Sequence, residues 1–515
     1  MAVSPEDLKR SVHCEPVRTG YLEETTEKVR MVARNHPLPV EMSTASSGVF
    51  GEAIVAHLVP RVQIDATYGI RDTDVETFTA TGGSADTNAR KFRCQTGTSA
   101  GGYGVIRSKR AVRYRPGMGA RFRFTAQFST PAALSLQWAG LFSSVDYLGF
   151  GYNGTSFGIT RRIPGVQHIH KFEVTAGTGG PTENATVTLD GSGVVTSLSG
   201  GLSAAEVARE LAESSYTGWS VEAVGTDVFF LAIDVGAKAG AFTYGTTGSS
   251  TATLTGIATG AANDNDTGHV AQADWVHDPM TWLDPAGLNI YEIEFGYLGS
   301  ANLRFRVYNP SRGRFVDAHC IERANDPLDT TVNVDNPSLK VGYIAASLGS
   351  TTALTVQGAS MLGAIEGEVH PFRNPRGAVA SQTGVSTEVS VLSIRNGRVF
   401  RGTVNQMEVF PKLLAVGVGG TKPAEVRVYL GATLTDALWN YQEEDSSCVE
   451  ICTDAIAPSG GRLVTAQALS GGGQVNLDLS DLEIHLEPTE VLTVTVTVSG
   501  GAGNNATVSL TWLED

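Results

Sequence analysis

Short stretches in which apolar and polar residues alternate occur along much of the chain after residue 62. Successive side chains of a β-strand point to opposite faces, so each stretch predicts a strand with one face in a core and the other toward water. The clearest stretches are 107–115, 121–128, 147–152, 289–295 and 303–308. The first three come before residue 172 and the last two after residue 262. This spacing indicates one strand-rich body that a separate segment interrupts.

The interrupting segment, residues 172–262, has the pattern of a small α+β domain. Four strand-like stretches surround one helical stretch that opens near Leu202. Ser203 is the expected N-cap of this helix, and Glu206 completes a capping box with it. We therefore expect 172–262 to be a domain inserted in a surface loop of a β-sandwich whose two parts are 62–171 and 263–369.

The two ends of the chain differ from this body. Residues 1–61 carry helix-start signals but little apolar periodicity, so we expect an N-terminal anchoring arm that docks on another subunit or on the body. Residues 370–515 contain the nearly pure Val/Thr alternation 491–498, which predicts a C-terminal β domain. The predicted fold class is mainly β: a multidomain β-sandwich of jelly-roll or lectin-like type, with the inserted α+β domain and a C-terminal β-sandwich.

Composition narrows the class of protein. The 515 residues are 41% hydrophobic and include 59 glycines, which suits a folded protein of many short strands and tight turns. A net charge of −15 disfavours nucleic acid as a partner, because neutralising phosphates needs a basic surface. Five widely spread cysteines do not form a disulfide framework. The first residues lack a signal-peptide pattern and no run reaches a membrane span, so we expect neither Sec-type secretion nor membrane insertion.

Candidate chemistry is sparse. No nucleophile elbow, phosphate-binding loop, dinucleotide fingerprint or zincin helix occurs, so we expect a protein that is not an enzyme and needs no cofactor. His168 and His170 form an H-x-H pair that a strand would project from one face, and they are the candidates for a metal, with ordinary polar-face histidines as the alternative. Trp275, Trp282 and Tyr297 are the candidate aromatics for contact with a glycan.

Two longer runs carry a resemblance. Residues 150–162 and 291–310 resemble structural proteins of tailed bacteriophages, in runs that are similar to a concanavalin or laminin-G type lectin-like sandwich. The resemblance covers about residues 62–365. It implies a place in the virion, assembly in the host bacterial cytoplasm and a homo-oligomer, with a trimer favoured.

The leading hypothesis is therefore a non-enzymatic virion structural protein, part of the tail or its appendages as a fibre or adaptor, which builds or displays a surface for assembly or host attachment. Its expected partners are other virion proteins through the N-terminal arm and a glycan of the host surface. One alternative is a capsid-surface fibre or decoration protein, and another is a carbohydrate-binding module for receptor recognition. A glycan-cleaving tailspike would need paired carboxylates in a groove, which sequence alone does not show.

Overall fold

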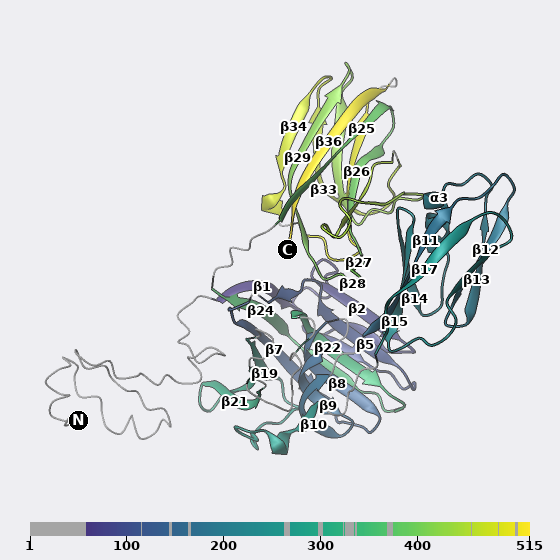
Figure 1. The fold of residues 1–515 in the computed structure, drawn as a ribbon. Coiled ribbons are helices and arrows are strands. Elements are labelled where there is room, and N and C mark those ends of the chain that lie inside the picture. Colours follow the sequence, from purple (N-terminus) through teal and green to yellow (C-terminus); the bar gives the residue numbers. More distant parts are fainter. Residues whose placement is uncertain are drawn as a thin grey trace, which may run out of the picture. The chain divides into compact units, whose positions relative to one another are not determined.

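The computed structural model describes residues 58–114, 116–143, 147–162, 166–261, 268–296, 302–322, 324, 334, 337–367, 374–454, 456–482, 484–499 and 503–515. They form two compact units (Figure 1). The first joins residues up to 164 with 264–369, and the second joins 165–263 with 370–515. The insert and the C-terminal domain, which the sequence suggests as separate domains, thus belong to one unit.

The first unit is a sandwich of two antiparallel sheets. One sheet has nine strands within the described residues: β21 (Arg314–Ile321), β20 (Leu303–Asn309), β19 (Asn289–Phe295), β7 (Ala120–Phe128), β23 (Thr355–Gly358), β4 (Lys91–Gln95) and β3 (Ser84–Asn88) in spatial order, with β24 (Ser360–Glu366) on β7 and β1 (Leu58–Asp65) on β24. The other sheet has β18 (His269–Ala271), β10 (Ser156–Arg162), β9 (Tyr147–Asn153), β8 (Ser135–Phe142), β22 (Ser338–Ser347), β5 (Tyr103–Ser108) and β2 (Val75–Ala80), with β6 (Val112–Arg113) on β22.

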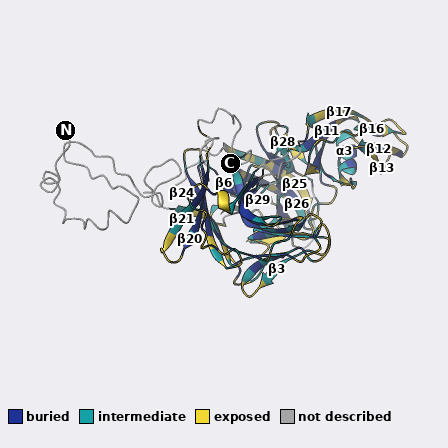
Figure 2. Ribbon diagram, turned by 90° about the horizontal axis from the view of Figure 1, so that it is seen from below, coloured by how far each residue is buried: buried dark blue, intermediate teal, exposed yellow. Residues whose placement is uncertain are grey.

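Alternation along the strands builds the core between these sheets. In β5 every second residue is buried, and Figure 2 shows the same change of buried and less buried positions along neighbouring strands. The core is rich in aromatic side chains, of which Phe122, Phe124, Phe150, Tyr291 and Phe305 are at most 2% exposed. A short 3-10 helix, η1 (Gln272–Asp274), follows β18.

The insert in the second unit contains two small sheets and a helix. Its sheets are β14 (Trp219–Val224), β15 (Asp227–Val235), β11 (Gln167–Ala176) and β17 (Thr251–Ala258), and β13 (Ser192–Leu198), β12 (Glu183–Leu189) and β16 (Thr243–Thr246). Helix α3 (Ala204–Glu213) buries Val207, Ala208 and Leu211 in the core of the insert. Ser203 caps it as predicted, and Glu206 returns the bond of the capping box.

The C-terminal domain is a second sandwich. One sheet orders β25 (Asn374–Val385), β36 (Asn504–Glu514), β29 (Val409–Gly419) and β34 (Gln474–Asp478), and the other orders β31 (Asn440–Tyr441), β32 (Val449–Cys452), β26 (Val389–Asn396), β35 (Val491–Val498), β30 (Ala424–Leu430) and β33 (Arg462–Leu469). A hairpin of β27 (Val399–Phe400) and β28 (Thr403–Val404) and the 3-10 helix η2 (Ser480–Leu482) complete it. The Val/Thr stretch forms the central strand β35, whose threonines Thr493 and Thr495 are buried, not exposed to water.

The predicted mainly β, multi-sheet architecture is confirmed, with α3 as the one α-helix among the described residues. Two predicted boundaries fall inside strands, because β1 crosses 61/62 and β11 crosses 171/172. Apart from residues 58–61, the anchoring arm predicted at 1–61 lies outside the described residues. Cys94, Cys320, Cys448 and Cys452 are buried thiols that form no disulfide with one another. In the part of the chain that the structure describes, no helix is long and apolar enough to cross a membrane.

Candidate functional site

The two candidate metal ligands lie side by side in the insert. His168 and His170 are 7% and 9% exposed, and their ring centroids are 4.4 Å apart. The Nδ1 atom of His168 accepts hydrogen bonds from the backbone N–H groups of Lys238 (3.1 Å) and Gly260 (3.3 Å). That atom is therefore already used within the protein, and no group of three or more metal-ligating side chains occurs among the described residues.

The ring of His170 packs among aromatic side chains in the core of the insert. It is stacked between Phe242, at a centroid distance of 4.1 Å, and Trp219, at 5.5 Å. Burial, with a smaller contribution from the neighbouring His168, lowers the pKa of His170 to about 4. The alternative prediction of ordinary histidines on a polar strand face is wrong, because both rings are buried. His170 is neutral near pH 7, since burial in the protein disfavours the charged imidazolium.

The three candidate glycan-contact aromatics differ in their surroundings. Trp275 is 4% exposed and packs against Phe150 and Phe157 at centroid distances of 5.9 and 6.2 Å. It is a core residue of the first unit, which corrects its prediction as an exposed sugar platform. Trp282 is 39% exposed, and Tyr297 lies outside the described residues.

A ladder of charged side chains crosses the outer face of the nine-stranded sheet. Arg121 faces Glu294 across the β7–β19 pair, and Glu292 faces Arg306 across the β19–β20 pair. Arg306 Nη1 lies 2.7 Å from Glu294 and 3.1 Å from Glu292, and its Nε lies 2.6 Å from Asp317. Burial raises the pKa of Glu294 to about 6, although Arg306 and Arg121 oppose the shift. Every one of these charges has a partner of opposite sign, as a structural ladder requires.

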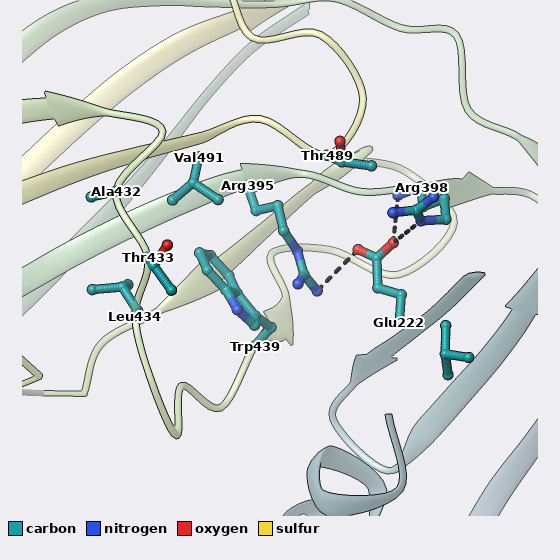
Figure 3. A pocket seen from close by; sticks show the side chains of 10 residues that line it. Glu222, Arg395, Arg398, Ala432, Thr433, Leu434, Trp439, Thr489 and Val491 are labelled. Atoms are coloured by element: carbon teal, nitrogen blue, oxygen red, sulfur yellow. Dashed lines mark hydrogen bonds and ion pairs between the residues drawn. The ribbon is translucent and has the colours of Figure 1, made fainter. Parts of the chain in front are cut away.

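A pocket of about 290 Å³ lies in the second unit where the insert meets the C-terminal domain (Figure 3). Its lining comes from β14 of the insert and from β26, β35 and three loops of the C-terminal domain. The lining residues are Val221, Glu222, Arg395, Arg398, Ala432, Thr433, Leu434, Trp439, Thr489 and Val491.

Glu222 joins the two parts of this unit. One of its oxygens lies 3.0 Å from Nη2 of Arg395, and the other accepts a hydrogen bond from the backbone N–H of Arg398 at 3.1 Å. Figure 3 shows the carboxylate between the two guanidinium groups. Arg395 Nη2 also donates to the carbonyl of Ala223 (3.1 Å), and Arg398 Nη1 donates to Ser220 Oγ (3.1 Å). The side chain of Glu222 is only 6% exposed, so these contacts are made away from bulk water.

Glu450 is a second buried carboxylate beside Arg395. Arg395 Nε donates to Glu450 Oε2 at 2.6 Å, and the side chain of Glu450 is 5% exposed. Burial raises the pKa of Glu450 well above its usual value; Arg395 opposes the shift and Glu222 adds to it. We call Glu222, Arg395, Arg398 and Glu450 the charge cluster. It holds two cations and two carboxyl groups, so each buried charge can be compensated locally.

Further contacts join the insert to the C-terminal domain beside the charge cluster. The hydroxyl of Tyr441 donates to Asp227 Oδ2 at 3.1 Å, and within the insert Lys171 Nζ neutralises the same oxygen at 2.6 Å. The backbone N–H of Gly225 donates to the carbonyl of Trp439 at 2.7 Å. These bonds fix the β14–β15 turn of the insert against the loop before β31.

None of the residues of the charge cluster is predicted as a site residue from the sequence. Glu222 and Arg395 each stand in a stretch of mainly apolar strand residues, and an isolated charge in such a stretch is a signal for a buried partner. Nothing in one sequence pairs two residues that are so far apart along the chain. The pairing appears only once the insert and the C-terminal domain are folded.

Comparisons with known proteins give weak likenesses. No protein-family model matches the chain, and no curated protein matches it. The carbohydrate recognition domain of Emp47p aligns with 60% of this chain and 97% of its own at 10% identity and a TM-score of 0.21. Lectin UEA-II, whose structure is complexed with galactose, aligns with 60% of this chain and 100% of its own at 8% identity and a TM-score of 0.22, and lectin II from Ulex europaeus aligns over the same shares at 9% and 0.21. At these TM-scores the likenesses carry no argument, and the two-sheet sandwich rests on the strand pairing itself.

Proposed function

We propose that this chain is a non-enzymatic structural protein of a bacteriophage virion, part of the tail or its appendages, that builds or displays a surface for assembly or host attachment. The resemblance of residues 150–162 and 291–310 to tailed-phage structural proteins supports the virion location. The chain is assembled in the host cytoplasm as a homo-oligomer, with a trimer favoured, and the arm 1–61 tethers it to other virion proteins.

One structural observation carries the display role. The insert is joined to the C-terminal domain by the charge cluster, in which Glu222 contacts Arg395 and Arg398 at once. Removing either partner of such a buried pair is costly, so the junction resists local opening. A protein that holds a surface at a set position in a particle needs this rigidity.

The same observation weighs against catalysis. Three buried carboxylates, Glu292, Glu294 and Glu222, each contact an arginine at 3.1 Å or less. A general acid or nucleophile has to face a substrate, whereas these carboxylates are committed to ion pairs. The ion pairing of these carboxylates supports a structural role for the chain and weighs against a glycan-cleaving tailspike.

Antibody labelling of the phage particles tests the location. Antibodies against the purified chain should decorate the tail or its appendages in electron micrographs, and a reconstruction should show trimeric density there. Decoration of the capsid surface would favour the fibre or decoration alternative, and particles of normal composition without the chain would refute a virion role. Release of reducing sugar from host glycans, abolished by one Asp or Glu substitution, would refute the non-enzymatic role.

A further inference from the structure

The pocket beside the charge cluster has polar groups that the protein leaves without hydrogen bonds. Within the described residues, Glu222 Oε1 and Arg398 Nε are buried and have no hydrogen-bond partner, although each lies within 3.0 to 3.4 Å of an oppositely charged group. Thr433 and Thr489 also line the pocket as exposed residues, and no hydrogen bond of either hydroxyl is found in the described part of the chain. Buried polar atoms normally have partners, so Glu222 Oε1 and Arg398 Nε point to a missing one, whereas the two exposed threonine hydroxyls can exchange water for a ligand.

We infer that this pocket binds one neutral hexose unit of a polysaccharide. The inference deepens the proposed function and rests on it only for the source of the sugar, a glycan of the host surface. It concerns the junction of the insert and the C-terminal domain, and not the sandwich of the first unit.

The charge of the pocket selects a neutral ligand. An anion would meet the carboxylate of Glu222, and a cation would meet the guanidinium groups of Arg395 and Arg398. A sugar hydroxyl donates one hydrogen bond and accepts others, so it can contact a carboxylate and a guanidinium together. Two threonine hydroxyls add groups with the same double capacity.

The remaining lining suits the C–H face of a sugar ring. Trp439 is half-buried, and Arg395 covers one face of its ring at 4.5 Å from the centroid, so a sugar has to pack on the opposite face or the edge of the ring. Leu434 and Val491 are further apolar lining residues, and Figure 3 shows Leu434 beside Trp439. An apolar wall with a few polar groups is the usual construction of a small-ligand site. The volume of about 290 Å³ lies at the small end of such sites and suits a single ring.

Backbone strain marks the same place. Thr489 has a φ of 78°, a conformation that a β-branched residue rarely adopts, and its N–H donates to the carbonyl of Asn396 at 2.6 Å. Strain of this kind persists where the surrounding structure enforces it, and it gathers at ligand-binding positions. Here it accompanies one of the hydroxyl groups of the pocket.

Saturation-transfer NMR on the purified full-length chain tests the inference. The probes are free glucose, galactose, mannose, N-acetylglucosamine and rhamnose, with glucuronate and inorganic phosphate as charged counterparts. At least one neutral sugar should bind in the millimolar range, and the two anions should bind more weakly than it does. Stronger binding of glucuronate or phosphate than of every neutral sugar would overturn the inference, and so would the absence of binding by all five neutral sugars.

Variants then place the binding site. Thr433→Val and Thr489→Val keep the side-chain shape and remove one hydroxyl, so each should weaken binding about fivefold, as expected for one hydrogen bond. Thr79→Val, which changes an exposed threonine of β2 in the first unit, is the matched control and should leave binding unchanged. Unchanged affinity in both threonine variants, with melting curves like that of the parent, would overturn the site.

The outcomes for sugar binding and for virion location are independent. A chain that labels the tail but binds none of the sugars would refute this inference and leave the proposed function standing. A chain that binds a neutral hexose through Thr433 and Thr489 but is missing from particles would refute the proposed function alone.

Discussion

Glu222 on β14 of the insert lies 3.0 Å from the guanidinium of Arg395 on β26 of the C-terminal domain, and their side chains are only 6% and 16% exposed. Burial removes both groups from water, so each depends on the other for compensation of its charge. The pair therefore couples the folding of the insert to that of the C-terminal domain. This coupling agrees with the finding that the two belong to one compact unit.

Glu222→Gln should destabilise the second unit by about 3 kcal/mol, because it leaves the largely buried Arg395 and the partly exposed Arg398 with one carboxylate fewer. The measurement is urea unfolding of the full chain, with limited proteolysis to locate the opening in or near the insert. The matched control is Glu425→Gln, since Glu425 pairs with Arg427 at 2.9 Å on a more exposed face. That change should cost less than about 1 kcal/mol. Equal effects of the two substitutions would contradict a coupling through Glu222.

Ser203→Ala should destabilise the insert by about 1 kcal/mol through loss of the N-cap of α3. Ser203 Oγ accepts a bond from the backbone N–H of Glu206 at 3.3 Å, and the carboxylate of Glu206 accepts one from the N–H of Ser203 at 2.8 Å. Circular dichroism during thermal unfolding measures the change. Ser203→Asp should keep most of the stability because aspartate also caps helices, and an unchanged midpoint for Ser203→Ala would show that the cap contributes nothing.

The capping box and the strand stretches could be predicted because they depend on residues close together in sequence. The burial of the charged ladder in the first unit could not be predicted in this way. Alternation in 121–128, 289–295 and 303–308 correctly separates two faces of each strand but assigns the polar face to water. Glu292 and Arg306 are each 1% exposed instead, because facing strands bring opposite charges together. Which strands pair is a property of the whole sheet, as is the meeting of Glu222 with Arg395.

Gly149→Ala should destabilise the first unit by about 1–3 kcal/mol, as overpacking does. A Cβ atom at this position would run into the hydroxyl of Tyr147 and the carbonyl of Ala139. Tyr147 lies on this part of the sheet, donates to the carbonyl of Phe150 at 3.1 Å and stacks on Trp138 at a centroid distance of 4.2 Å. Differential scanning calorimetry measures the effect.

The control for this substitution is Gly417→Ala in β29. No heavy atom lies within 4 Å of a Cβ built on Gly417, and its φ is not positive. Alanine should therefore be neutral there or slightly stabilising, because it restricts the unfolded chain. A loss of stability at Gly417 as large as that at Gly149 would show that the contact with Tyr147 is not the cause.

The sandwich of the first unit should fold without the insert. The strands on either side of the insertion, β10 and β18, pair with each other in the register Thr160 opposite His269, so a short Gly/Ser link can replace residues 165–263. We expect a chain of residues 58–164, this link and 264–369 to be soluble and to unfold cooperatively, because its aromatic core lies within these residues. Dispersed amide signals in an NMR spectrum would support this, and an aggregated or molten product would contradict it.

The stability of the second unit should fall as the pH drops from about 6.5 toward 4, in part through His170. The pKa of His170 is about 4 in the folded protein and near its ordinary value of 6.5 in the unfolded chain. Between these values the unfolded chain binds the proton and the folded one does not, so acid favours unfolding, and above pH 6.5 the contribution is complete. His170→Phe keeps a ring between Trp219 and Phe242 and removes the titrating group. The difference in urea midpoint between pH 7.5 and pH 5 should therefore be smaller in this variant than in the parent chain, and an identical difference in both would show that His170 does not titrate in this way.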